Sequence, residues 1–263
     1  YAPLIAAGVP RLVVDRATAE LVKTAANAFL ATKISFINAM ADVADAAGAD
    51  VTALADALGL DARIGRRFLN AGLGFGGGCL PKDIRAFRAR AEQLGVGESL
   101  AFLDAVDRVN LGRRDLVVDR VVAALDGEVR DRPVAVWGLA FKPDSDDVRD
   151  SPALEVAQRL HATGARVTAS DPVAIHTARY RAPELTYAAD PIDAARDAEA
   201  LVVATEWETY RAIDPRMLGP VTRIRTVIDA RNCLDADRWV DAGWTYRGLG
   251  RPARLGRLAV PAF

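Results

Sequence analysis

The chain has 263 residues, of which 51% are hydrophobic and 26% charged, a balance typical of globular proteins. Its 34 Lys and Arg residues nearly equal its 35 Asp and Glu residues, which excludes binding to nucleic acid or an anionic membrane through bulk charge. Two cysteines and two histidines, with no Cys-x-x-Cys or His-x-x-x-His spacing, argue against a zinc site. Neither a signal peptide nor a run of about 18 apolar residues is visible, so we expect a cytoplasmic protein with reduced thiols.

The first residues read differently from the rest. The chain opens with Tyr1 instead of Met, and the apolar run at 11–14 is typical of a strand that has lost its neighbours. We therefore interpret residues 1–14 as the remainder of a preceding domain.

A long helical segment follows. Apolar residues recur every three or four positions from Asp15 to about Ala47, and Gly48 suits a C-terminal cap. Lys23 and Asn27 fall one turn apart on one face of this helix. Three further helices are expected over residues 50–58, 81–94 and 98–125. No strand pattern interrupts this half, which we predict to be entirely helical.

The hydrophobic pattern of the sequence changes after residue 132, where short apolar runs alternate with helical segments. Strands are expected over residues 133–137, 166–170, 200–204, 226–229 and 245–247, and helices over residues 151–162 and 191–198. This alternation predicts a parallel sheet covered on both faces, in a doubly wound, Rossmann-like α/β domain. Ligands of such sheets bind beyond the carboxyl ends of the strands, which directs attention to the loop starting at Gly138. That loop lacks G-x-G-x-x-G, so we do not expect it to hold a dinucleotide in the usual way.

The most informative segment is 72–83, where five glycines lie within seven residues and lead to Cys79. Leu80 and Pro81 then begin a helical pattern, and proline suits the first helical turn. A lone cysteine is more often a small buried apolar side chain than a nucleophile. Here the glycine run, the helix N-terminus and the cation of Lys82 favour a reactive thiolate aimed at a small ligand.

The same run satisfies G-x-G-x-x-G at Gly72, Gly74 and Gly77. That motif indicates a dinucleotide site only when it follows a strand and opens a helix. The preceding segment, 62–71, is basic and irregular or helical, so we reject this interpretation.

Three segments, Glu20–Asn38, Gly74–Asp83 and Gly138–Pro152, together resemble the UDP-glucose/GDP-mannose dehydrogenase family. The likeness covers nearly the whole chain, with the motifs in the family's order. It implies a helical central domain over 15–112 that forms a homodimer, and a connecting helix with a UDP-sugar-binding domain over 113–263. Residues 1–14 would then be a stub of the family's N-terminal NAD-binding domain.

The resemblance implies an NAD-dependent, four-electron oxidation of UDP-glucose to UDP-glucuronate. Cys79 would capture the intermediate aldehyde as a thiohemiacetal, which a second oxidation converts to a thioester for hydrolysis. Lys23 and Asn27 would donate to the oxygen that becomes anionic, and Asp83 would orient or activate water.

The resemblance also assigns contacts with the UDP-sugar to Lys23, Asn27, Phe68, Leu69, Asn70, Ala71, Gly72, Gly76, Phe141, Lys142 and Arg231. Arg63 matches an arginine that reaches the substrate of the neighbouring subunit. Lys82 and Arg149 match residues that contact NAD, and no metal is implied.

Two alternatives stay open. The same chemistry suits a GDP-mannose or UDP-N-acetylhexosamine dehydrogenase, because a few side chains distinguish these sugars. A non-catalytic nucleotide-sugar sensor or dimerisation module would differ in class, and would tolerate Cys79→Ser. Since the cofactor loop and an acid/base glutamate of the family are not in this sequence, we expect no NADH formation by this chain alone.

Overall fold

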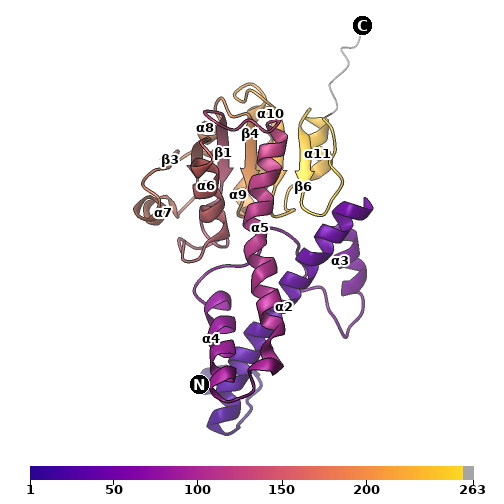
Figure 1. Ribbon diagram of the computed structural model, residues 1–263, viewed down its shortest axis with the longest axis vertical. Helices are drawn as coiled ribbons and strands as arrows, with labels where there is room; N and C mark the ends of the chain where they lie inside the picture. The colour runs from indigo at the N-terminus through magenta and orange to yellow at the C-terminus, as the bar shows by residue number, and fades with distance from the viewer. Residues whose placement is uncertain (257–263) are drawn as a thin grey trace.

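The computed structural model describes residues 1–256, which form a helical half and an α/β half (Figure 1). The long helix α5 (Phe102–Ala124) belongs to both, because it packs on α2 at one end and against the sheet and α6 at the other. The mixed architecture predicted from the sequence is confirmed. The last seven residues of the predicted domain 113–263 lie outside the described residues.

The helical half begins with α2 (Arg16–Ala47). The Asp15 carboxylate caps it by accepting the Thr18 backbone N–H at 2.9 Å, and Gly48 ends it in a left-handed conformation with φ of 70°. The remaining elements are α3 (Val51–Gly59), α4 (Leu80–Gln93), the 3₁₀ turn η1 (Gly97–Leu100) and α5. The helix expected over 98–125 therefore starts with a 3₁₀ turn, a common form for a first turn.

The α/β half contains a single six-stranded parallel sheet in the order β3-β2-β1-β4-β5-β6. The strands are β1 (Pro133–Trp137), β2 (Arg166–Ser170), β3 (Thr186–Tyr187), β4 (Ala200–Val203), β5 (Thr226–Asp229) and β6 (Thr245–Gly248). Chain order reverses between β1 and β4, so the loops after these two strands diverge and leave room for a ligand. The doubly wound sheet is as predicted, except for β3, which is too short to give a sequence pattern.

Helices cover both faces of the sheet. Besides α5, they are α6 (Pro152–Ala162), α7 (Ile175–Arg181), α8 (Pro191–Ala194), α9 (Glu208–Ala212), α10 (Pro215–Leu218) and α11 (Ala236–Asp241). The helix predicted over 191–198 stops at Ala194, and Asp197 has a left-handed φ of 59° that a helix cannot continue through.

Successive side chains of β1 point to opposite faces of the sheet and contribute to two different hydrophobic cores. Val134 and Val136 face the core beneath α5 and α6, whereas Ala135 and Trp137 face a second core that is rich in aromatic rings. In that second core Trp137 stacks on Tyr210 with ring centroids 5.2 Å apart. Both faces of the strand are buried, as the continuous apolar pattern predicted.

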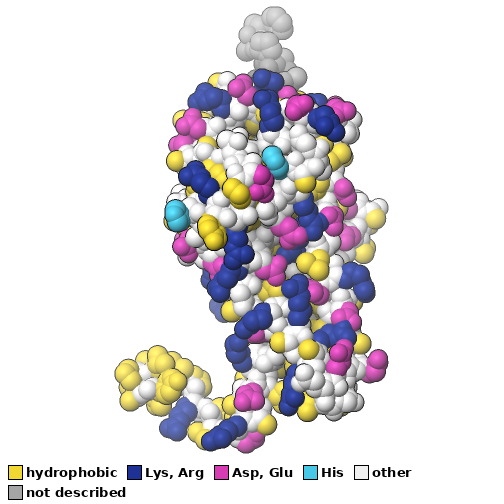
Figure 2. All heavy atoms as spheres, turned by 60° about the vertical axis from the view of Figure 1, so that its left-hand side comes forward, with side chains coloured by type: hydrophobic (Ala, Val, Ile, Leu, Met, Phe, Trp, Pro, Cys, Tyr) yellow, Lys and Arg dark blue, Asp and Glu magenta, His cyan; other side chains and the backbone are white. Residues whose placement is uncertain are grey.

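The N-terminal segment does not form the expected strand. Residues 2–6 form the short helix α1 (Ala2–Ala6), and residues 11–14 are irregular where a strand was expected. A strand needs a neighbour for its backbone N–H and C=O groups, and among residues 1–256 none lies beside this run. Leu12 is 82% exposed, and Figure 2 shows the apolar N-terminal segment projecting from the lower end of the helical half.

Within residues 1–256, no helix has both the length and the hydropathy needed to cross a membrane. The same part of the chain holds no group of three or more His, Cys, Asp or Glu side chains arranged to bind a metal ion.

Candidate active site

Cys79 is the N-cap residue of α4, and its side chain is exposed. The Asp83 backbone N–H donates to the Cys79 carbonyl at 2.9 Å, and Pro81 stands in the first turn. The glycine run thus delivers the thiol to a helix N-terminus, as its spacing predicted.

A cluster of polar side chains joins α2 to α4 one turn beyond Cys79. The Asp83 Oδ2 atom accepts from Lys23 Nζ at 2.9 Å and from Asn27 Nδ2 at 2.6 Å, while Lys82 Nζ lies 3.3 Å from Oδ1. The Lys23 hydrogen bond, assisted by those of Asn27 and Lys82, lowers the pKa of Asp83 to about 2 against the opposing effect of burial. Asp83 is therefore an anion at neutral pH that holds the other side chains in place.

Two cations flank the thiol. The pKa of Lys23 is raised first by its hydrogen bond with Asp83, and the nearby charge of Cys79 adds to this effect. The pKa of Arg149 is raised first by its hydrogen bond with Asp147, and again Cys79 contributes. A thiolate at Cys79 would therefore sit in a locally positive environment.

The glycine loop lies against the loop that follows β1. A Cβ atom on Gly76 would collide with the Asp150 carbonyl oxygen. At Gly77, where φ is +80°, a Cβ atom would lie 2.7 Å from the Phe141 ring. The Gly77 backbone N–H also donates to the Arg149 carbonyl at 3.0 Å. Only glycines allow the two halves of the chain to approach this closely.

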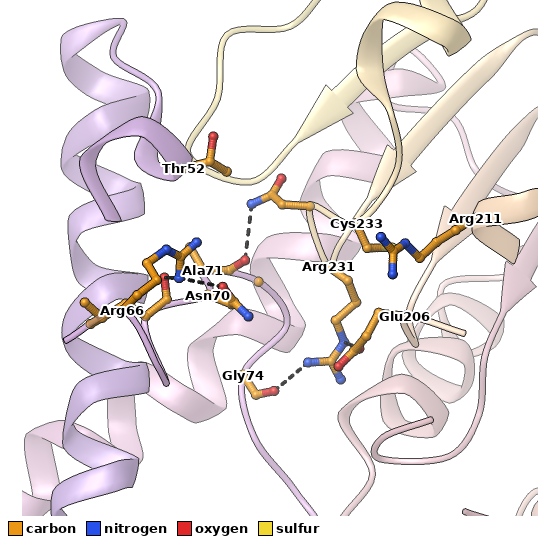
Figure 3. Close-up of a pocket in the computed structure, with 12 residues that line it drawn as sticks. Thr52, Arg66, Asn70, Ala71, Gly74, Glu206, Arg211, Arg231 and Cys233 are labelled. Carbon is orange, nitrogen blue, oxygen red and sulfur yellow. Dashed lines mark hydrogen bonds and ion pairs between the residues drawn. The ribbon is translucent and has the colours of Figure 1, made fainter. Parts of the chain in front are cut away.

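Two adjoining cavities follow this contact between the halves. The larger has a volume of about 650 Å³ and is lined by residues that include Cys79, Phe68, Gly76, Phe141, Lys142 and Arg149. The second, of about 320 Å³, is lined by residues that include Arg66, Leu69, Ala71, Gly72, Asn232 and Cys233 (Figure 3). Asn70, Gly74, Glu206 and Arg231 line both. The two cavities therefore adjoin, and Cys79 lines the larger of them.

Arg231 stands where the two cavities meet. Its Nε atom donates to the Ala204 carbonyl and its Nη1 atom to the Gly74 carbonyl, each at 2.8 Å, so the guanidinium bridges the two halves (Figure 3). Glu206 lies opposite, with Oε2 3.3 Å from Arg231 Nε. The buried Nη2 atom of Arg231 has no hydrogen-bond partner. An anionic or carbonyl oxygen of a ligand would satisfy it.

Most of the sequence-predicted residues come together here, and a few do not line the cavities. Lys23, Asn27 and Asp83 adjoin Cys79 but are not among the residues that line the larger cavity, and Lys82 pairs with Asp83. Arg63 is 89% exposed in its side chain, pairs with Asp61 and is not among the residues that line either cavity.

Sequence reasoning missed several lining residues, notably Glu206, Asn232 and Asp147. Glu206 follows β4 at its carboxyl end, so the strand-end rule that selected Gly138 would also have found it. Asn232 follows β5 at its carboxyl end in the same way, and it donates to the Ala71 and Leu249 carbonyls.

The two cysteines differ in solvent exposure, because Cys79 is exposed and Cys233 is half-buried. Burial raises the pKa of the Cys233 thiol far above its ordinary value, and the negative charge of Asp229 raises it further. Cys233 is therefore held as an unreactive thiol, and Cys79 is the one of the two suited to chemistry.

Comparison with known proteins agrees with this geometry. Residues 17–111 match the central domain of the UDP-glucose/GDP-mannose dehydrogenase family, and residues 135–236 match the family's UDP binding domain. The chain is 42% identical over 252 residues to UDP-glucose 6-dehydrogenase of Rhizobium meliloti, covering 96% of this chain and 57% of that protein. It is 41% identical to UDP-glucose 6-dehydrogenase TuaD of Bacillus subtilis, covering 91% of this chain and 51% of that protein.

Among solved structures, a UDP-glucose dehydrogenase from the hyperthermophilic archaeon Pyrobaculum islandicum superposes with a TM-score of 0.82 at 40% identity. That match covers 92% of this chain and 53% of the archaeal one. The chain thus spans little more than half the length of the relatives it matches. The two domain matches and these relatives agree, and the chain belongs to the UDP-glucose/GDP-mannose dehydrogenase family.

Proposed function

We propose that this chain carries the thiol-bearing and UDP-sugar-binding parts of an NAD-dependent UDP-glucose 6-dehydrogenase, which oxidises the C6 alcohol of UDP-glucose to a carboxylate. The observation that supports this most strongly is the position of Cys79. The exposed thiol lines the larger of the two adjoining cavities, beside the Lys23, Asn27 and Asp83 cluster. Named relatives at about 40% identity act on UDP-glucose, which favours this sugar nucleotide over the alternatives.

Cys79 is the proposed nucleophile. Its sulfur would add to the C6 aldehyde to give a thiohemiacetal, which retains a reactive intermediate between the two oxidations. The thioester formed next would be hydrolysed by water, which returns the free thiol. Covalent capture explains why a chain with two cysteines places one of them, exposed, at a helix N-terminus.

Lys23 and Asn27 are the proposed donors to the oxygen that becomes anionic on C6. Asp83 has a pKa of about 2, which makes it a poor proton acceptor at neutral pH. Of its two expected roles, we therefore favour orientation of Lys23, Asn27 and water over proton removal from water.

The UDP-sugar is proposed to lie along the two cavities, with its sugar towards Cys79. Phe141 and Lys142 come from the loop after β1, and Arg231 offers an unpaired N–H at the junction. On the other side the backbone of residues 68–72 and of Gly76 is proposed to receive the ligand. A diphosphate between two basic side chains suits this arrangement of charge.

NAD, when bound, would supply the hydride acceptor for both oxidations, and Lys82 and Arg149 are the residues proposed to contact it. Both side chains are about two-thirds exposed, at 68% and 66%. The sheet of this chain does not fit a dinucleotide. In a dinucleotide-binding sheet, an acidic side chain in this region accepts a hydrogen bond from the ribose of the cofactor. Here Asp171, at the carboxyl end of β2, already accepts the N–H groups of Leu139, Ala140, Val173, Ala174 and Trp207. We propose that the cofactor loop belongs to the part of the relatives that lies outside this match.

A homodimer through the central helices is also proposed. Val22, Phe29, Phe36 and Val43 recur every seven residues on α2 and are between 49% and 66% exposed. Such an apolar stripe on a long helix suits packing against a second copy. The dimer would bring Arg63 to the partner's substrate. Phe29→Glu with Phe36→Glu should convert the dimer to monomer in analytical ultracentrifugation, whereas a monomeric unsubstituted chain would contradict the proposal.

Binding of nucleotide sugars to this chain tests the function. In isothermal titration calorimetry we expect UDP-glucose to bind more tightly than UDP-N-acetylglucosamine and GDP-mannose. Cys79→Ser should leave this affinity within about twofold, because the serine hydroxyl can make every hydrogen bond that the thiol makes. Absence of binding by all three, or a preference for GDP-mannose, would contradict the assignment.

A further inference from the structure

The buried side-chain carboxamide of Asn110 binds the glycine loop through both the backbone N–H and the backbone carbonyl of Phe75. Asn110, on α5, is 1% exposed. Its Oδ1 atom accepts the Phe75 backbone N–H at 2.8 Å, and its Nδ2 atom donates to the Phe75 carbonyl at 3.0 Å. We propose that Asn110 is a positioning residue that fixes Cys79 for reaction with a bound UDP-sugar; this inference rests on the proposed function.

The glycine loop needs hydrogen bonds from outside because its own residues restrict the backbone conformation very little. Gly74 has φ of +86°, and a Cβ atom there would collide with Asn110 Oδ1, so the close approach requires glycine. Between Phe75 and Cys79 stand three more glycines, which leave the backbone free to adopt many conformations. The position of the thiol therefore depends on contacts from outside the loop.

Asn110 is itself held in place from the α/β half. Its backbone carbonyl accepts from Arg114 Nη1 at 3.0 Å, and Arg114 is fully buried. Arg114 Nε pairs with Glu155 Oε2 at 2.6 Å, and Nη2 lies 3.4 Å from Asp150 Oδ1. The carbonyl of the same Asp150 borders Gly76, so this network grips the glycine loop from both sides.

Loss of the Asn110 carboxamide would leave two polar groups of Phe75 without partners in a buried place, since Phe75 is 6% exposed. Asn110→Ala removes both bonds. Asn110→Asp is the milder variant, because it keeps an acceptor for the Phe75 N–H while its ionised form opposes the Phe75 carbonyl.

Ser35 provides the matched control. Its Oγ atom donates to the Val106 carbonyl at 2.8 Å, and the residue is 3% exposed. Ser35→Ala therefore also removes a buried hydrogen bond between α2 and α5, but one that does not touch the glycine loop.

The first measurement is amide hydrogen exchange of residues 72–79 by mass spectrometry, on the full chain without ligand. Exchange should accelerate about tenfold or more in Asn110→Ala, less in Asn110→Asp, and stay within about twofold in Ser35→Ala. Equal acceleration in Asn110→Ala and Ser35→Ala, or none in Asn110→Ala, would overturn the proposal.

The second measurement separates positioning from general loosening. UDP-6-chloro-6-deoxyglucose places an electrophilic C6 in the site, where the Cys79 sulfur forms the C–S bond as the C–Cl bond breaks and chloride leaves. At saturating reagent, labelling of Cys79 should fall about tenfold in Asn110→Ala and remain unchanged in Ser35→Ala. Free iodoacetamide, which needs no alignment, should label the exposed thiol within about twofold of the unsubstituted rate in every variant.

Cys233 serves as an internal reporter, since its thiol is half-buried with a raised pKa and should be labelled slowly unless the fold opens. Unchanged labelling of Cys79 by the bound reagent in Asn110→Ala, or a parallel rise in Cys233 labelling, would overturn the positioning role. If the unsubstituted chain does not react with the UDP reagent, the proposed function is wrong, and the exchange measurement still decides whether Asn110 fixes the loop.

Discussion

Lys23 Nζ lies 2.9 Å from Asp83 Oδ2, and this contact joins the first half of α2 to the helix that Cys79 caps. The two residues are sixty positions apart in the sequence, so the pair constrains how the central helices pack. Because Asn27 donates to the same oxygen, one carboxylate orients both proposed donors to the reacting sugar.

The Asp83 carboxylate should make stability depend on pH in the acid range. Its pKa in the folded protein is about 2, below the ordinary 3.8, so its stabilising effect is complete above 3.8 and disappears as pH falls towards 2. We expect the unsubstituted chain to exceed Asp83→Asn in urea midpoint at neutral pH, and the difference to shrink in that window. A difference independent of pH would contradict the ion pair.

Close packing at Gly77 predicts a strong effect of a small substitution. Gly77→Ala combines a φ of +80° with a Cβ atom 2.7 Å from the Phe141 ring, and should cost about 1–3 kcal/mol of unfolding free energy. UDP-glucose affinity should fall as well, because Phe141 lines the site. Gly112→Ala is the control: it lies in α5 with no atom within 4 Å of the added carbon, and should be neutral or stabilising. Similar losses in both variants would contradict this view of the loop.

Arg231 should contribute strongly to UDP affinity. Lysine keeps the charge but cannot reach the Ala204 and Gly74 carbonyls while offering a further N–H to the ligand. We expect Arg231→Lys to weaken UDP binding about tenfold or more in calorimetry. Arg196→Lys, at an exposed pair with Asp193, should change it by less than about twofold. Equal affinities for the two variants would exclude Arg231 from the site.

This chain alone should form no NADH from UDP-glucose and NAD. The carboxylate of Asp171 is saturated by backbone and indole N–H groups, and the Gly138 loop lacks a dinucleotide motif. Absorbance at the NADH band, measured beside a full-length UDP-glucose 6-dehydrogenase as positive control, checks this. Clear turnover by this chain would show that it holds a cofactor site of its own.

Local patterns were enough to predict the longer helices, five of the six strands and the approach of the glycine loop to the N-terminus of α4. The short helices α1, α7, α9, α10 and α11 were not predicted. The period of α2, its start near Asp15 and its cap at Gly48 are visible in sequence, because a helix is stabilised by neighbours a few positions apart. The short strand β3 was missed, since two residues give no alternation. The run at 11–14, interpreted as a strand that has lost its neighbours, forms no strand among residues 1–256, since strand propensity without a partner strand forms no sheet.

Site residues with a local sequence pattern or a family likeness could also be predicted, and those that depend on distant contacts could not. Cys79 was predicted from its neighbours, and the substrate and donor residues from the resemblance. Asn110 was not foreseen, because nothing in its local sequence shows that it meets Phe75, thirty-five positions away. Glu206 was overlooked although it follows a strand. Contacts that join the two halves depend on tertiary packing, which local patterns do not encode.

Covalent labelling by UDP-6-chloro-6-deoxyglucose, followed by peptide mass spectrometry, tests the central claim most directly. We expect a single adduct on Cys79, suppressed by excess UDP-glucose and absent from Cys79→Ser. Labelling of Cys233 instead, or labelling of Cys79 that excess UDP-glucose leaves unchanged, would contradict a UDP-sugar site built around this thiol.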